Sequence, residues 1–114
     1  MPPTPRRGDV WLVALNPTVG HEIQKTRPAI VVTDDLYNKH NWVVLVVPVT
    51  SRESADIDQV LLHSPEGGLS NTSVTLPDQM RAIDRQRLVK HLGRLSENKL
   101  RQLDRTLRIV LSLR

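Results

Sequence analysis

A series of short apolar segments, separated by turn-forming residues and followed by one helical repeat, constrains this chain most. Segments rich in β-branched residues predict strands over residues 9–15, 28–33, 42–49, 58–63, 72–76 and 88–92, with 80–84 as strand or turn. Short strands at this spacing predict a mainly β fold, a small barrel or curled sheet. A parallel nucleotide-binding fold is disfavoured because helices do not alternate with the strands.

The C-terminal residues predict one amphipathic helix that lies on this sheet. Ser96 stands at the position of a helix N-cap, with Leu95 and Leu100 at the spacing of a hydrophobic staple. The apolar residues that follow at helical spacing are Leu100, Leu103, Leu107, Val110 and Leu111.

The prolines and the polar segments set the expected boundaries. Pro28 is expected to open the second strand, where no ladder donor is needed, and Pro48 indicates an edge or bulge near the end of the third. Residues 34–41 could hold one helical turn, and residues 50–57 read as a loop. We expect a flexible, Pro-rich tail over residues 1–7 and a single domain over residues 8–114.

Composition excludes several classes of protein. The 114 residues fit one domain, and the chain has no Cys, so disulfides and thiolate metal sites are absent. The longest apolar run, Val43–Val49, is too short to span a membrane, and the N-terminus has no signal-peptide apolar region. With only three aromatic residues, the chain offers little for stacking nucleobases.

The formal net charge of +4 is unevenly distributed along the sequence. Residues 1–79 carry six Lys/Arg and nine Asp/Glu, a net −3, whereas residues 80–114 carry ten and three, a net +7. The basic C-terminal part is either a solvated helix surface or a binding surface for a polyanion or an acidic partner.

The sequence lacks the motifs of metal and nucleotide sites. Its four histidines are scattered without an HxH or HxxxH pair, and we expect no metal. Neither a phosphate-binding glycine loop nor a serine nucleophile elbow is present, and no cofactor is expected.

Polar side chains instead gather beside the predicted strand ends, where sites commonly lie. These residues are Glu22, Arg27, Thr50, Ser51, Asp78, Gln79 and Arg81. Together they supply a cation, carboxylates and hydroxyls. That set suits acid–base cleavage of RNA, in which the 2′-hydroxyl is the nucleophile and an arginine stabilises charge on the phosphorus.

Ordered blocks of sequence resemble the MazF/PemK/Kid family of toxin endoribonucleases. The blocks are RGDVWLV at 7–13, NPTVGHE at 16–22, TRPAIVV at 26–32, VVPVTS at 46–51 and DQMRAID at 78–84, with Arg87-Leu88 after them. The resemblance covers the chain from Arg7 to Leu113.

The resemblance implies an SH3-like small barrel of the CcdB/PemK type with a C-terminal helix, assembled as a homodimer. It implies a toxin that cleaves single-stranded mRNA at short sequences without metal, leaving a 2′,3′-cyclic phosphate and a 5′-hydroxyl. It also implies a bacterial cytoplasmic protein, neutralised by an acidic antitoxin of the MazE/PemI type.

Site residues follow from the resemblance position by position. Arg27 and Thr50 match the pair implicated in cleavage, Glu22 a loop glutamate that serves as base or RNA contact, and Asp78 an acid–base residue. The further RNA contacts expected are His21, Lys25, Ser51, Gln79 and Arg81. One position departs from the Kid-like pattern: Leu76 stands where those members have an arginine, two residues before the acid.

Two alternatives remain open at this level. A CcdB-like toxin would bind DNA gyrase without catalysis, and a weakened family member would act by binding RNA or the antitoxin.

Overall fold

The computed structural model describes residues 4–15 and 26–114. Its strands are β1 (Asp9–Ala14), β2 (Thr26–Val31), β3 (Val43–Ser51), β4 (Leu61–Leu62), β5 (Ser73–Thr75), β6 (Arg81–Asp84) and β7 (Leu88–Arg94). Its helices are α1 (Asp35–His40) and α2 (Glu97–Leu111), and short 3-10 turns occupy Glu66–Gly68, Pro77–Gln79 and Arg85–Arg87.

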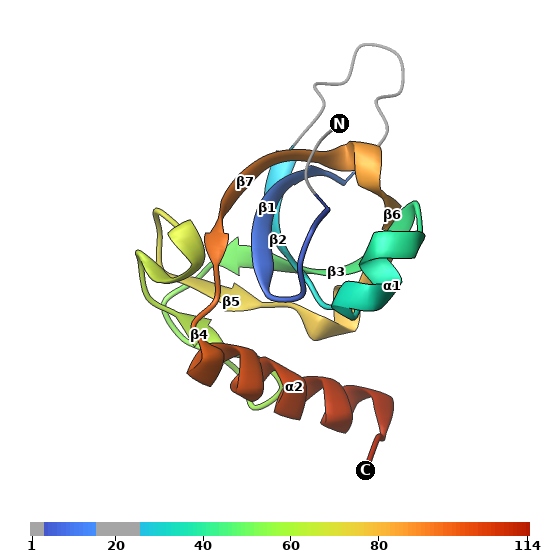
Figure 1. Cartoon of the computed structure of the whole chain (residues 1–114). Coiled ribbons are helices and arrows are strands. Elements are labelled where there is room, and N and C mark those ends of the chain that lie inside the picture. Colours follow the sequence, from blue (N-terminus) through green and yellow to red (C-terminus); the bar gives the residue numbers. More distant parts are fainter. Residues whose placement is uncertain (1–3, 16–25) are drawn as a thin grey trace, which may run out of the picture.

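All seven strands join one antiparallel sheet in the order β4-β5-β3-β2-β1-β7, and β6 also pairs with β3. The sheet curls so that β7 and β1 arch over β3, and α2 lies across its outside (Figure 1). The expected mainly β fold, a small curled barrel with a C-terminal helix, is confirmed.

Apolar side chains on both faces of the strands form two cores. One core joins the outer face of the sheet to α2, through Val10, Ile30 and Val47 on the strands and Leu103 and Leu107 on the helix. The other lies inside the curl and is built from Trp11, Val13, Leu15, Ala29, Val31, Val44, Val46 and Ile83. Alternate residues of β1 therefore serve different cores, which explains its apolar residues on both faces.

Strand β3 extends further than the sequence predicted. Thr50 and Ser51, expected in a loop, are the last residues of β3, where they pair with Val74 and Ser73 of β5. Pro48 is neither at an edge nor in a bulge. It pairs with Ala29 of β2, at the place where β3 passes from one set of neighbours to the next.

Two other strand boundaries were wrong. Pro28 is the third residue of β2 rather than the first, and it pairs with Leu12 of β1. Pairing of β2 with β3 begins only at Ala29, so Pro28 interrupts no pair on that side. The strand expected over 58–63 is reduced to Leu61–Leu62, because only these residues pair with β5.

Helix α2 begins as predicted. The Ser96 hydroxyl caps it by accepting a hydrogen bond from the Lys99 amide at 3.3 Å, and Glu66 accepts hydrogen bonds from the Ser96 amide at 2.8 Å and hydroxyl at 2.9 Å. Neither helix in the described part of the chain has the length and apolar character needed to cross a membrane.

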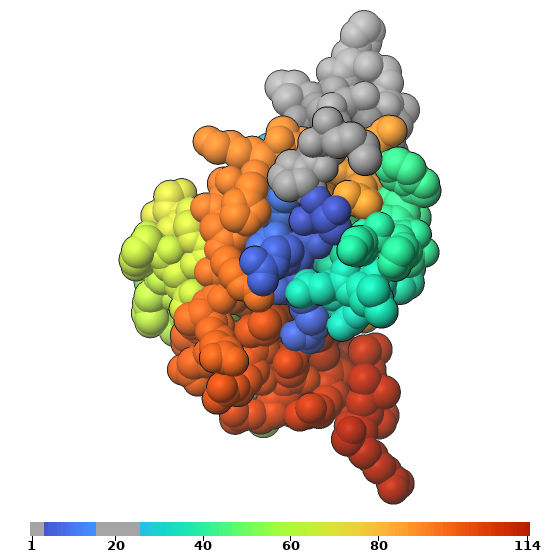
Figure 2. All heavy atoms as spheres, viewed as in Figure 1, coloured from blue at the N-terminus to red at the C-terminus, as the bar shows by residue number. Residues whose placement is uncertain are grey.

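The end of α2 differs from the expected face. Val110 and Leu111, which the pattern placed on the sheet, are 38% and 45% exposed. In Figure 2 the C-terminal end of the chain, in red, projects from the body of the molecule. The sheet therefore covers α2 only as far as Leu107.

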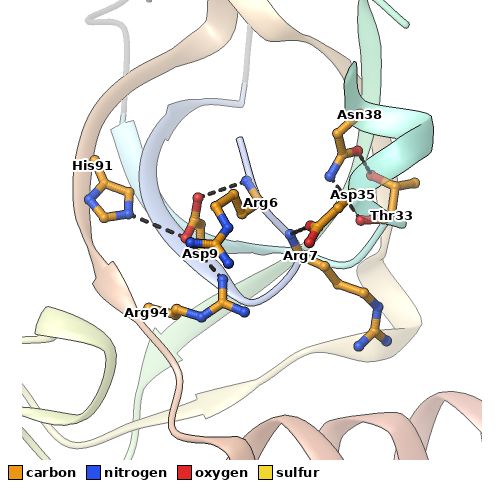
Figure 3. Close-up of polar contacts among 8 residues, drawn as sticks. All are labelled: Arg6, Arg7, Asp9, Thr33, Asp35, Asn38, His91 and Arg94. Carbon is orange, nitrogen blue, oxygen red and sulfur yellow. Dashed lines mark hydrogen bonds and ion pairs between the residues drawn. The ribbon is translucent and has the colours of Figure 1, made fainter. Parts of the chain in front are cut away.

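Residues at the end of the expected tail pack onto the domain (Figure 3). Pro5 is buried, and the Arg7 amide donates to Asp35 at 2.6 Å. The Arg7 guanidinium donates to the Val32 carbonyl at 3.0 Å and forms an ion pair with Asp104 of α2. These contacts extend the packed part of the chain back to Pro5.

A second polar cluster joins β1 to β7. The buried Asp9 carboxylate accepts from the Arg6 amide at 2.7 Å and lies 3.4 Å from His91 Nε2 and 3.5 Å from the Arg94 guanidinium (Figure 3). Asp9 is thereby fixed by three partners, so this residue of the RGDVWLV block has a structural role in this fold.

Candidate active site

The register of the sheet places two arginines on one side of it. Paired residues of antiparallel strands project to the same side. Arg27 of β2 pairs with Val13, and Arg81 of β6 pairs with Val46, and both valines belong to the core inside the curl. Both arginines are themselves exposed, so they lie at the margin of this core.

These arginines share a pocket of about 400 Å³. Its lining residues are Leu15, Arg27, Pro48, Val49, Leu76, Gln79 and Arg81. β2 contributes one guanidinium, β6 the other, and the Pro77–Gln79 turn the amide of Gln79. The structure thus brings together three of the residues that the sequence nominated.

The Pro77–Gln79 turn is held against β3 by backbone hydrogen bonds. The Leu76 amide donates to the Pro48 carbonyl at 2.8 Å, and the Gln79 amide donates to the Leu76 carbonyl at 2.9 Å. Pro77 opens the turn, where its fixed φ is favourable and no amide hydrogen is required. Asp78 is exposed on this turn, next to Gln79, but is not among the lining residues.

Thr50 and Ser51 also lie next to the lining without being part of it. Val49, the preceding residue of β3, lines the pocket. Pairing of β3 with β2 ends at Pro48 and Ala29, and from Val49 onward β3 pairs with β5. Thr50 therefore follows directly after two lining residues of β3, two positions beyond the last pair with the strand of Arg27.

Three nominated residues, His21, Glu22 and Lys25, lie outside the described residues. The nearest described residues on either side are Leu15 and Thr26, followed by Arg27. Leu15 and Arg27 both line the pocket.

The described lining of the pocket is cationic. It includes two arginines and no aspartate or glutamate. Among the ion pairs of residues 4–15 and 26–114, none involves Arg27, Arg81 or Asp78. Such a site favours an anionic ligand, and guanidinium groups suit phosphate because they can donate two parallel hydrogen bonds. Within the same described ranges, no group of three His, Asp or Glu is arranged to hold a metal ion.

Sequence reasoning missed the apolar wall of the pocket, which comprises Leu15, Pro48, Val49 and Leu76. Each is an ordinary strand or strand-end residue in the sequence, and only the register reveals that they surround Arg27 and Arg81. Of these four residues, only Leu76 was singled out in the sequence, because it stands where Kid-like members have an arginine.

Known proteins resemble this chain over nearly its whole length. Endoribonuclease MazF9 of Mycobacterium tuberculosis is 39% identical, across 95% of this chain and 97% of that protein. A crystal structure of MazE–MazF from Deinococcus radiodurans superposes with a TM-score of 0.83 at 28% identity, covering 97% of this chain and 98% of that one.

A mycobacterial endoribonuclease in complex with its cognate antitoxin has the same fold. Its TM-score is 0.80 at 21% identity, covering 96% of this chain and 97% of that one. Residues 6–111 match the sequence profile of the PemK-like, MazF-like toxins. With this match over most of its length, the chain belongs to the PemK-like, MazF-like toxin family of type II toxin–antitoxin systems.

Proposed function

We propose that the pocket between Arg27 and Arg81 is the site at which this toxin endoribonuclease cleaves single-stranded RNA without a metal ion. The single observation that carries the proposal is the juxtaposition of two arginines, exposed and without carboxylates in the described lining. Family membership supports the reaction, and the register that puts both arginines on one side of the sheet supports this location.

The reaction is an internal transfer at phosphorus. The ribose 2′-oxygen attacks the adjacent phosphorus and loses its proton to a general base, for which Glu22 and Asp78 are the candidates. The bond from phosphorus to the 5′-oxygen breaks, and the leaving oxygen takes a proton from a general acid. The products are a 2′,3′-cyclic phosphate and a 5′-hydroxyl.

Arg27 and Thr50 act on the phosphate in this scheme. The Arg27 guanidinium binds the non-bridging oxygens and stabilises the negative charge that grows on them. The Thr50 hydroxyl donates to the same group from the end of β3. Ser51, Gln79, His21 and Lys25 hold the flanking nucleotides. Unpaired bases expose edges that hydrogen bonds can read, which suits a chain with few aromatic rings.

The toxin works as a homodimer in the bacterial cytoplasm and is neutralised by an acidic antitoxin. The structure of a mycobacterial endoribonuclease in complex with its cognate antitoxin supports the antitoxin as a partner. Exposed apolar side chains at the end of α2, with Leu111 at 45% and Leu113 at 57% exposure, are available for assembly.

The decisive experiment is digestion of a long RNA of defined sequence by the purified protein. We expect cuts at one short sequence, with a cyclic phosphate upstream and a 5′-hydroxyl downstream of each cut. A protein that binds gyrase and leaves RNA intact would be a CcdB-like toxin. Binding of RNA without cleavage would identify the weakened family member.

Chelation tests the metal-free part of the mechanism. We expect the cleavage rate in EDTA to equal the rate in magnesium, because the proposed groups are a cation, carboxylates and a hydroxyl. Loss of cleavage in EDTA, with recovery on adding a divalent ion, would contradict it. A magnesium-dependent nuclease in the same assay serves as the control for chelation.

A further inference from the structure

We propose that Arg81 is a second catalytic residue, which binds the scissile phosphate opposite Arg27 and stabilises the charge of the transition state. This assignment rests on the proposed RNA cleavage and goes beyond an RNA-binding contact. The observation behind it is that Arg27 and Arg81 line one pocket from two different strands.

The strand register directs the side chains of Arg27 and Arg81 to the same side of the sheet. Arg81 is the first residue of β6 and pairs with Val46, which in turn pairs with Val31 of β2. Residues of β2 at alternate positions from Val31, through Ala29 to Arg27, project to the same side as Val31. Arg27 and Arg81 therefore stand on one side of the sheet, with β3 between their strands.

Arginines of β7 and of the Arg85–Arg87 turn have structural partners, and Arg27 and Arg81 differ from them. Arg87 donates to the Ala14 carbonyl at 3.1 Å, and Arg94 lies 3.5 Å from the Asp9 carboxylate. Arg85 donates to two backbone carbonyls near α1. No hydrogen bond or ion pair among the described residues involves the Arg27 or Arg81 guanidinium. Within residues 4–15 and 26–114, no other protein group therefore engages the donors of these two guanidiniums.

Leu76 stands where Kid-like members have an arginine, so a second cation for the phosphate has to come from another position, here Arg81 of β6. Its side chain lines the pocket and contributes apolar surface, so the cations of the described lining are Arg27 and Arg81 alone. As the 2′-oxygen attacks, charge develops on both non-bridging oxygens of the phosphate. Two guanidiniums from two different strands can each donate to one of these oxygens, which divides the stabilisation between them.

The test compares cleavage with binding in Arg81→Ala and Arg81→Lys. Cleavage is measured under single-turnover conditions, and binding is measured with the same RNA carrying a 2′-deoxyribose at the cut site. We expect Arg81→Ala to lower the cleavage rate by about 10²-fold, the loss typical of removing one transition-state donor. The dissociation constant should rise by much less, and Arg81→Lys should keep part of the rate because it keeps the charge.

Controls separate a catalytic role from a structural one. Arg101→Ala, at an exposed position on α2 far along the chain from the pocket, should cut at the wild-type rate. The unfolding midpoint of Arg81→Ala should match the wild type, since Arg81 is exposed. The double variant Leu76→Arg with Arg81→Ala carries a new guanidinium on the same pocket. We expect it to cleave about tenfold faster than Arg81→Ala alone.

Two outcomes would overturn the assignment while leaving RNA cleavage itself in place. One is a wild-type cleavage rate in Arg81→Ala. The other is an equal loss of binding and of cleavage, which would make Arg81 a binding contact only. If the wild-type protein does not cut RNA, that result contradicts the proposed function itself, and the role of Arg81 is rejected together with it.

Discussion

Arg27 is the residue on which the proposed chemistry depends most. It combines an exposed guanidinium, a place in the pocket and a fixed position on β2 opposite Val13. We expect Arg27→Ala to lower single-turnover RNA cleavage by about 10²- to 10³-fold. Arg27→Lys should be intermediate, because an ammonium retains the charge but cannot form a bidentate contact.

The measurement for Arg27 is the rate of cut-site formation in a defined RNA, with Arg101→Ala as the matched arginine control. Circular dichroism should show an unchanged fold for each variant. Cleavage by Arg27→Ala at the wild-type rate would remove Arg27 from the mechanism.

At the level of single residues, the sequence predicted the polar part of the site better than its apolar part. Arg27, Gln79 and Arg81 were nominated from strand ends and do share a pocket. Leu15 and Val49 were not nominated, because β1 and β3 are apolar on both faces, and such a pattern does not tell which residues face a core and which face a pocket. For Glu22, which lies outside the described residues, the assignment stays a prediction.

Among the elements, α2 depends on a contact from a distant turn. Glu66 accepts hydrogen bonds from both the amide and the hydroxyl of Ser96, and the hydroxyl in turn caps the helix. We expect Ser96→Ala to lower the free energy of unfolding by about 1 kcal/mol, the usual cost of losing an N-cap. Denaturation in urea measures it.

A double-mutant cycle tests the link between Glu66 and Ser96. The effects of Glu66→Ala and Ser96→Ala should be less than additive, since each removes the same hydrogen bonds. Glu97→Ala, on the exposed first turn of α2, is the matched carboxylate control and should change stability little. Strict additivity would show that Glu66 and Ser96 act independently.

Strand and helix boundaries were predictable where local signals set them and not where a partner did. The N-cap at Ser96 and the α1 helix after Asp34 follow from nearby residues, and both are present. Thr50 and Ser51 became strand because β5 pairs with them. Leu111 stays partly exposed because a pocket, not a packed contact, lies between the end of α2 and Leu45 of β3. Long-range pairing, which the sequence does not display, decided these cases.

Across the whole molecule, charge is divided between an acidic first part and a basic last part. The α2 surface contributes to the basic part, with Arg101, Arg105 and Arg108 exposed. We expect affinity for an acidic antitoxin to fall as salt concentration rises, because screening weakens attraction between exposed charges. Calorimetric titration over a range of ionic strengths measures it.

Charge-reducing variants sharpen this test. Replacing Arg105 and Arg108, both exposed on α2, by alanine should weaken the dependence of the dissociation constant on salt, if α2 contributes to the attraction. A dissociation constant that does not change with salt in the wild-type protein would show that apolar contacts dominate the complex.

The order of the sheet determines when during translation this toxin can complete its fold. β1 lies between β2, which follows soon after it, and β7, which is the last strand of the sheet in chain order. The ion pair between Arg7 and Asp104 likewise cannot form until α2 has been translated. A nascent chain therefore leaves one side of its first strand unpaired until residues 88–94 have been translated. A truncated translation product that ends before β7 would keep Arg27 and Arg81 but lack the frame that holds them.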